Sequence, residues 1–255
     1  MKNITLLILL FSTLVCFSQK PLEILELAYK QKSLDQLEYF FDNWKNKTPE
    51  YDYTDSLEIK RLAVELYISF YNPFNLKNIG LETDDSTFSW VKYLIIQNKL
   101  IIYQVDSESI SVKPQGILDD SILFIRDSII DFRPKITFPN ISILYLTKDY
   151  EKTLLEFLGD KHTPLGYGGI MNPARASGKS FKKQRFLNEV VCIIYGHWGG
   201  YWHLETHPEI YNIVFNKSKT VAKVNYRIGY QGGEATFEYK ENVWLFTEGR
   251  LTWME

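Results

Sequence analysis

The sequence is poor in cysteine, with two such residues among 255. We expect Cys16 to leave with an N-terminal targeting segment, and the remaining Cys192 cannot then form an internal disulfide. Its apolar neighbours at 190–195 favour the neutral thiol, so we interpret Cys192 as a small core residue and not as a nucleophile. The hydrophobic core must then stabilise the fold, and the 45% of apolar residues supply it.

A surplus of one charge is also lacking, because 29 basic and 31 acidic residues give a net charge of -2. Proteins that bind nucleic acid usually carry a basic surplus on one face, so we expect no nucleic-acid partner. Complete catalytic motifs are absent as well. There is no Gly-x-Ser-x-Gly element, and the glycines at 166–169 lack the lysine-serine pair of a phosphate-binding loop. These absences leave open whether the chain is an enzyme.

The one long apolar run follows Lys2 and covers roughly a dozen residues. With small side chains at Cys16 and Ser18, it matches a secretory signal peptide at residues 1–18, which is too short to span a membrane. We therefore expect an exported protein, periplasmic or extracellular, with no transmembrane segment in the mature chain. The alternative is lipid attachment at Cys16, which Val15 disfavours because a small residue usually precedes a lipidated cysteine.

Residues 19–82 have a helical pattern, in which apolar side chains recur at spacings of three and four. Ser33 and Gln36 match a capping box at the start of one helix, and a second helix opens near Asp55 or Ser56. Residues 83–160 mix helix and strand, and residues 161–178 are a Gly/Pro-rich connection. The elements predicted in the mixed section are a β-hairpin of 88–96 and 100–105, strands at 122–126, 129–132 and 141–146, and a helix from Thr147 that Gly159 closes.

Residues 179–255 alternate apolar and polar side chains, as the strands of a one-sided antiparallel sheet do. After a helix at 180–189, the predicted strands are 190–195, 201–207, 210–215, 221–230, 234–240 and 243–253. The chain is thus expected to be an α+β protein, with a helical N-terminal segment, a mixed middle section and a curved C-terminal meander packed on a helix.

The order of elements from 177 to 255 resembles the NTF2-like α+β domains. The resemblance rests on a helix that feeds a curved meander, on Gly232-Gly233-Glu234-Ala235 and on Asn242-Val243-Trp244. It implies a pocket on the sheet and no particular reaction, because such domains include both enzymes and binding modules. No catalytic residue is carried over from it.

The most unusual composition lies at 196–208, which holds three of the four histidines and two of the six tryptophans. If 201–207 is a strand, then His203, Glu205 and His207 share one face and offer ligands for a divalent metal. These positions span about 13 Å along a strand, so one ion would need two histidines and a further ligand such as His197 or His162. This interpretation predicts a metal-dependent hydrolase. The alternative is that the histidines form the hydrogen-bonded rim of a sheet.

The same stretch offers flat rings beside an open backbone. Trp198, Tyr201 and Trp202 flank Gly199-Gly200 and have the chemistry to stack on a sugar or on an apolar side chain, unless they fill the core. Polar specificity across the same sheet is expected from Arg227, Glu234 and Glu238, unless these side chains form only cross-strand pairs. His197 is also expected among the ligand-binding residues. Our first hypothesis is therefore a non-enzymatic exported protein without a cofactor, whose C-terminal sheet binds a small molecule, a glycan or a protein.

Overall fold

The computed structural model describes residues 20–81, 88–113, 117–118, 123–159, 178–196 and 202–254. These residues form five α-helices, one short 3-10 helix, a six-stranded sheet and three two-stranded sheets, which confirms the α+β class. Among them, no helix has the length and apolar character needed to cross a membrane. The predicted signal peptide and nearly all of the Gly/Pro-rich connection lie outside the described residues.

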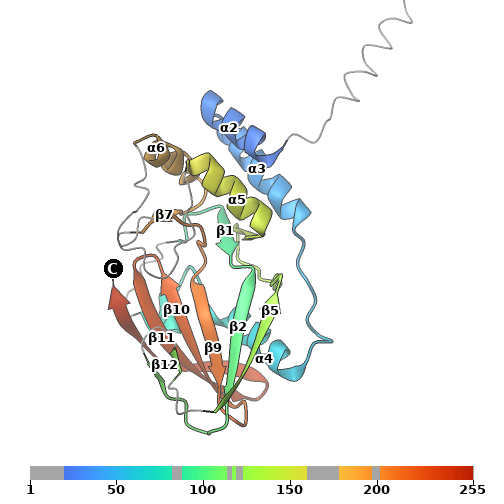
Figure 1. Cartoon of the computed structure of the whole chain (residues 1–255), viewed down its shortest axis with the longest axis vertical. Coiled ribbons are helices and arrows are strands. Elements are labelled where there is room, and N and C mark those ends of the chain that lie inside the picture. Colours follow the sequence, from blue (N-terminus) through green and yellow to red (C-terminus); the bar gives the residue numbers. More distant parts are fainter. Residues whose placement is uncertain are drawn as a thin grey trace, which may run out of the picture.

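Four helices gather at one end of the molecule (Figure 1), and a fifth lies against the sheet. The first four are α2 (Pro21–Gln31), α3 (Leu34–Lys47), α5 (Lys148–Leu158) and α6 (Gly178–Leu187). The fifth is α4 (Glu58–Phe70), which precedes the 3-10 helix η1 (Leu76–Ile79). The predicted cap of α3 is confirmed, because the Ser33 hydroxyl accepts a hydrogen bond of 3.3 Å from the amide of Gln36.

The six-stranded sheet has the strand order β12-β11-β10-β9-β2-β5. Its strands are β2 (Lys99–Val105), β5 (Phe124–Ile130), β9 (Glu209–Phe215), β10 (Val221–Ile228), β11 (Gln231–Lys240) and β12 (Val243–Met254). The antiparallel meander from β9 to β12 was predicted, whereas the parallel pairing of β2 with β9 was not. Because β2 and β5 come from the middle section, the sheet crosses the boundary that the sequence suggested before residue 179.

The predicted hairpin around Gln97-Asn98 is wrong. Strand β1 (Tyr93–Ile96) pairs in parallel with β6 (Ser142–Tyr145), while β2 pairs with β5 and β9. The reason lies in the Gln97 side chain, which donates to the carbonyl of Ile210 at 2.9 Å and accepts from its amide at 2.6 Å. The amide side chain thereby acts as a strand partner for the start of β9, and the backbone passes from one sheet to the next.

Four further strand predictions need correction. The segments 190–195 and 201–207 shorten to β7 (Ile194–Tyr195) and β8 (Trp202–His203), which pair with each other outside the six-stranded sheet. The two strands predicted between 122 and 132 are the single strand β5. The remaining short pair is β3 (Val112–Lys113) with β4 (Ile117–Leu118).

The pair β1/β6 divides two hydrophobic cores. Along β1, Leu94 and Ile96 belong to the sheet core, which α4 and the six-stranded sheet enclose, while Tyr93 and Ile95 belong to the helical core under α2, α3 and α5. All four residues of β1 are buried, as expected for parallel strands that are covered on both faces. The helix that covers the sheet is therefore α4 and not α6, whose Leu187 lies in the helical core.

Candidate functional site

The segment that follows β8 joins the two cores. Trp202 and Leu204 are buried in the helical core. Thr206 and His207 both donate their amides to the carbonyl of Ile95, at 3.0 and 3.1 Å, and the Thr206 hydroxyl accepts from the Ile95 amide at 2.8 Å. Both amides converge on one carbonyl, which a regular ladder does not allow. The prediction of an extended strand through His207 is therefore wrong beyond His203.

His207 lies in the sheet core between two tyrosines of the α4 region. Its ring stacks on Tyr67 with centroids 5.1 Å apart and meets Tyr71 edge-on at 4.7 Å. Nδ1 lies 3.2 Å from the Tyr67 hydroxyl and 3.2 Å from the carbonyl of Pro208. Burial lowers the pKa of His207 to about 3, so the imidazole is neutral near pH 7. Within the part of the chain that the structure describes, Nε2 has no hydrogen-bond partner.

His203 is also buried but has a different environment. Burial and then the charge of Arg227 lower its pKa to about 3, so this histidine is neutral as well. Across the described ranges, no three histidine, cysteine, aspartate or glutamate side chains lie close enough to hold a metal ion. A metal site at His203, Glu205 or His207 would thus need a ligand such as His162 or His197, which lie outside the described residues.

Two carboxylates and a guanidinium come together at the start of the meander. Arg227 on β10 is the cross-strand neighbour of Glu209 on β9, and Glu205 precedes that strand. Burial and then repulsion from Glu209 raise the pKa of Glu205 to about 7, and burial also raises the pKa of Glu209, while Arg227 opposes both effects. We call His203, Glu205, Glu209 and Arg227 the polar cluster.

The guanidinium of Arg227 is held by local packing. Its Nε donates to the carbonyl of Gly229 at 2.8 Å, and its Cζ lies 5.4 Å from the centre of the Trp253 ring. Gly232 makes this arrangement possible, since a Cβ at that position would lie 2.0 Å from Trp253. Arg227 is 6% exposed, and Glu205 and Glu209 are half-buried.

The other predicted ligand-binding residues separate into three groups. Glu234 accepts from Arg250 at 2.8 Å and lies 3.6 Å from Lys223, so it takes part in an ion-pair network on the same face of the sheet. Trp202 is 5% exposed and packs on Tyr195, with ring centroids 4.7 Å apart, which favours the core-filling interpretation of this indole. His197, Trp198 and Tyr201 lie outside the described residues.

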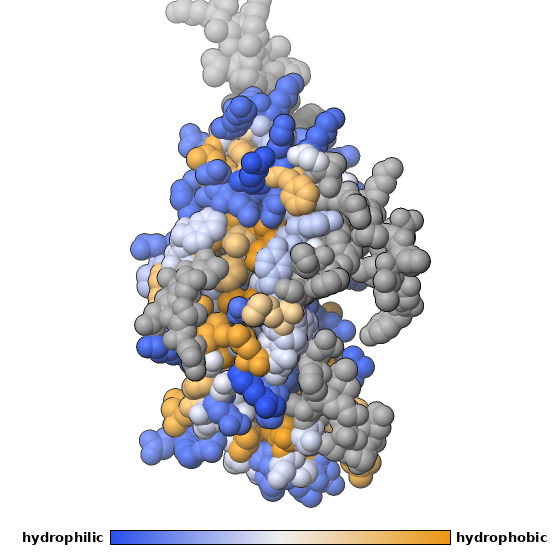
Figure 2. Space-filling view, turned by 90° about the vertical axis from the view of Figure 1, so that its left-hand side faces the viewer, coloured by the Kyte–Doolittle hydropathy of each residue, from blue (hydrophilic) through white to orange (hydrophobic). Residues whose placement is uncertain are grey.

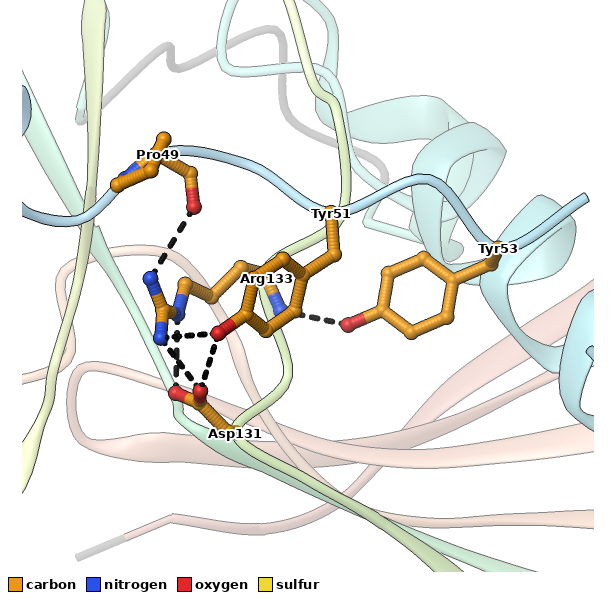
Figure 3. Close-up of polar contacts among 5 residues, drawn as sticks. All are labelled: Pro49, Tyr51, Tyr53, Asp131 and Arg133. Carbon is orange, nitrogen blue, oxygen red and sulfur yellow. Dashed lines mark hydrogen bonds and ion pairs between the residues drawn. The ribbon is translucent and has the colours of Figure 1, made fainter.

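A second polar assembly has no counterpart in the sequence predictions. It fastens the connection between α3 and α4, residues 48–57, which we call the strap (Figure 3). Arg133 donates to Asp131 at 2.9 Å, to the Tyr51 hydroxyl at 2.6 Å and to the carbonyl of Pro49 at 3.3 Å. Its amide donates to the Tyr53 hydroxyl at 2.9 Å, and its guanidinium lies 4.2 Å from the centre of the Tyr51 ring.

The strap borders a groove of about 440 Å³ against α4. Glu50 and Lys135 line both this groove and an adjoining groove of about 200 Å³. The larger groove is lined by strap residues 50–54, by Lys135 and by one side of α4 with Arg61, Val64, Glu65 and Ile68. Two tyrosines in a short interhelical connection, Tyr51 and Tyr53, are the sequence signal that could have indicated this region.

Comparison with known proteins gives no further identification. No family model, no curated protein and no solved structure matches the chain.

Proposed function

We propose that the chain is an exported, non-enzymatic binding protein whose polar cluster holds a small neutral ligand rich in hydroxyl or amide groups. The observation that carries the proposal is the grouping of Glu205, Glu209 and Arg227 at one end of the sheet. Ionisable groups with strongly shifted pKa values collect at functional sites more often than at purely structural ones.

The charges of the cluster indicate the class of ligand. With its pKa raised to about 7, the Glu205 carboxyl is partly protonated near neutral pH, and Arg227 opposes the negative charge of Glu205 and Glu209. His203 is neutral. A site of small net charge that offers both donors and acceptors suits a neutral polar ligand better than an ion.

The test is a thermal-shift and calorimetric titration with neutral probes: glucose, galactose, maltose, N-acetylglucosamine and N-acetylglycinamide. At least one probe should bind, and its affinity should change between pH 6 and 8 as Glu205 ionises. Arg227→Gln should lose the response. Lys223→Gln, on the same strand and the same face, is the matched control and should keep it. Failure of every probe, or binding that Arg227→Gln leaves unchanged, would contradict the proposal.

The predicted export and the NTF2-like relationship of residues 177–255 belong to the same proposal. Export is supported by the N-terminal pattern at 1–18, and the relationship by the meander of β9 to β12. Expression with the native N-terminus, followed by N-terminal sequencing of the secreted product, tests export. A mature protein that begins at Gln19 is expected.

The metal-dependent hydrolase is the second candidate, because Nε2 of His207 has no hydrogen-bond partner among the residues that the structure describes. If Nδ1 of His207 donates its proton to Pro208, the lone pair of Nε2 is available to a metal ion. Elemental analysis after purification without chelator tests this function. Stoichiometric zinc, iron or manganese that is lost in His207→Ala would favour the hydrolase, and its absence would remove it.

A further inference from the structure

Strand β12 is one edge of the six-stranded sheet, and several of its apolar side chains are exposed. Val243 is 51% exposed, Leu245 47%, Leu251 43% and Met254 68%. Figure 2 shows the side of the molecule on which this edge lies, with apolar residues gathered across the middle of the face. An edge strand presents unpaired backbone donors and acceptors, so exposed apolar side chains along it favour pairing with another strand.

In the middle of β12, an acidic and a basic residue lie one position before and one position after Gly249. Glu248 and Arg250 flank Gly249, and these residues lie in the regular run from 248 to 251 between two irregularities of the β11–β12 ladder. Both side chains are on the same face, opposite Thr236 and Glu234 of β11. Arg250 is already paired with Glu234, at 2.8 Å.

We infer that β12 pairs in antiparallel fashion with β12 of a second copy, about a two-fold axis that passes midway between the Gly249 residues of the two strands. Directly opposite residues of antiparallel strands point to the same face. The axis therefore places Glu248 of each copy opposite Arg250 of the other, so that two ion pairs form. Each of these ion pairs extends the pair of Glu234 with Arg250, so that negative and positive side chains alternate from Glu234 through Arg250 to Glu248 of the second copy.

The opposite edge of the sheet does not have this property. Strand β5 carries Arg126 and Asp127 in succession, which places them on opposite faces, so antiparallel pairing about a two-fold axis cannot bring them together. Asp127 is also paired with Lys60 of α4, at 3.3 Å. Charge complementarity therefore selects β12 and a second copy of the same chain.

Sedimentation velocity of the chain at low ionic strength tests the pairing. The wild-type protein should be a dimer, and added salt should weaken it. Glu248→Arg places two arginine pairs across the axis and should raise the dissociation constant at least about tenfold. Glu241→Arg makes the same change of charge in the turn between β11 and β12, away from the axis, and should leave the dimer intact.

Mixing two variants provides a test that a loss of folding cannot imitate. Glu248→Arg and Arg250→Glu should each dimerise poorly alone, whereas a mixture should form a heterodimer with two attractive pairs restored. Hydrogen exchange of the β12 amides, compared at low and high protein concentration, is the second measurement if Arg250→Glu does not fold. A monomer at all concentrations, a dimer insensitive to Glu248→Arg, or β12 amides that are unprotected in the dimer would overturn the inference.

Discussion

Replacing Glu205 by Gln should make the protein more stable at alkaline pH, because it removes an acid that is costly to ionise in the folded state. The folded pKa of Glu205 is about 7, against 4.5 ordinarily. A raised carboxyl pKa means that the folded protein holds a proton between these two values while the unfolded chain releases it. The stability that this group contributes at low pH is therefore lost as pH rises from 4.5 to 7.

The difference between the two pKa values corresponds to about 3 kcal/mol. We expect the free energy of unfolding of Glu205→Gln, relative to wild type, to rise by about this amount between pH 4 and pH 8. Urea denaturation followed by tryptophan fluorescence at four pH values gives the difference. The histidines titrate equally in both proteins, so their contribution cancels.

Two further variants make the assay specific. Glu241→Gln, in the exposed turn between β11 and β12, should show no difference that depends on pH. Glu209→Gln keeps Glu205 but removes the negative charge that most raises its pKa, so the midpoint of the pH dependence should move below 7. If the Glu205→Gln difference is constant from pH 4 to pH 8, the carboxyl is not buried beside Glu209, and the polar cluster as described is wrong.

Three other outcomes follow from the same structure. His207→Leu should reduce the loss of stability in acid. The pKa of His207 is about 3 in the folded protein and 6.5 ordinarily, so the unfolded chain takes up a proton between these values and the folded protein does not. The free energy of unfolding of the wild type should therefore fall by about 3 kcal/mol from pH 7 to pH 4.5, whereas this contribution is absent from the variant, as urea titrations at both pH values would show. Gly232→Ala should cost about 1–3 kcal/mol and alter near-ultraviolet circular dichroism, because its Cβ would lie 2.0 Å from an indole carbon; wild-type values would contradict the packing. Arg133→Leu should speed chymotryptic cleavage at Tyr51, whereas Lys135→Leu should not; equal rates would show that the guanidinium does not fasten the strap.

Local signals in the sequence predicted much of the fold. The alternation of Ala222, Val224 and Tyr226 with polar neighbours gave the correct faces of β10, and Ser33 gave the start of α3. These features depend on neighbouring residues alone. The predicted hairpin at Gln97-Asn98 is wrong because the Gln97 side chain bonds to the backbone of Ile210, which is 113 positions away, instead of taking part in a turn. No local pattern reports such a contact.

The sequence named three members of the polar cluster, His203, Glu205 and Arg227, but not how they are arranged. His203, Glu205 and His207 were expected to share a face, but the bonds of Thr206 to β1 end the strand and place His207 against α4. Arg227 was expected to be a polar contact on the sheet, and it is the cation of the cluster. Glu209 was missed, since only pairing with Arg227 across two strands brings it near Glu205.

The position of Glu205 depends on both cores at once. Leu204 before it is buried in the helical core, and His207 after it is stacked on Tyr67 in the sheet core, with Thr206 bonded to the strand that separates them. Arg227, by contrast, belongs to the sheet alone. A change in how the two cores pack must therefore alter the separation of Glu205 from Arg227, and with it the pKa of the carboxyl. We therefore expect the ionisation of Glu205 to respond to changes in how the two cores pack against each other.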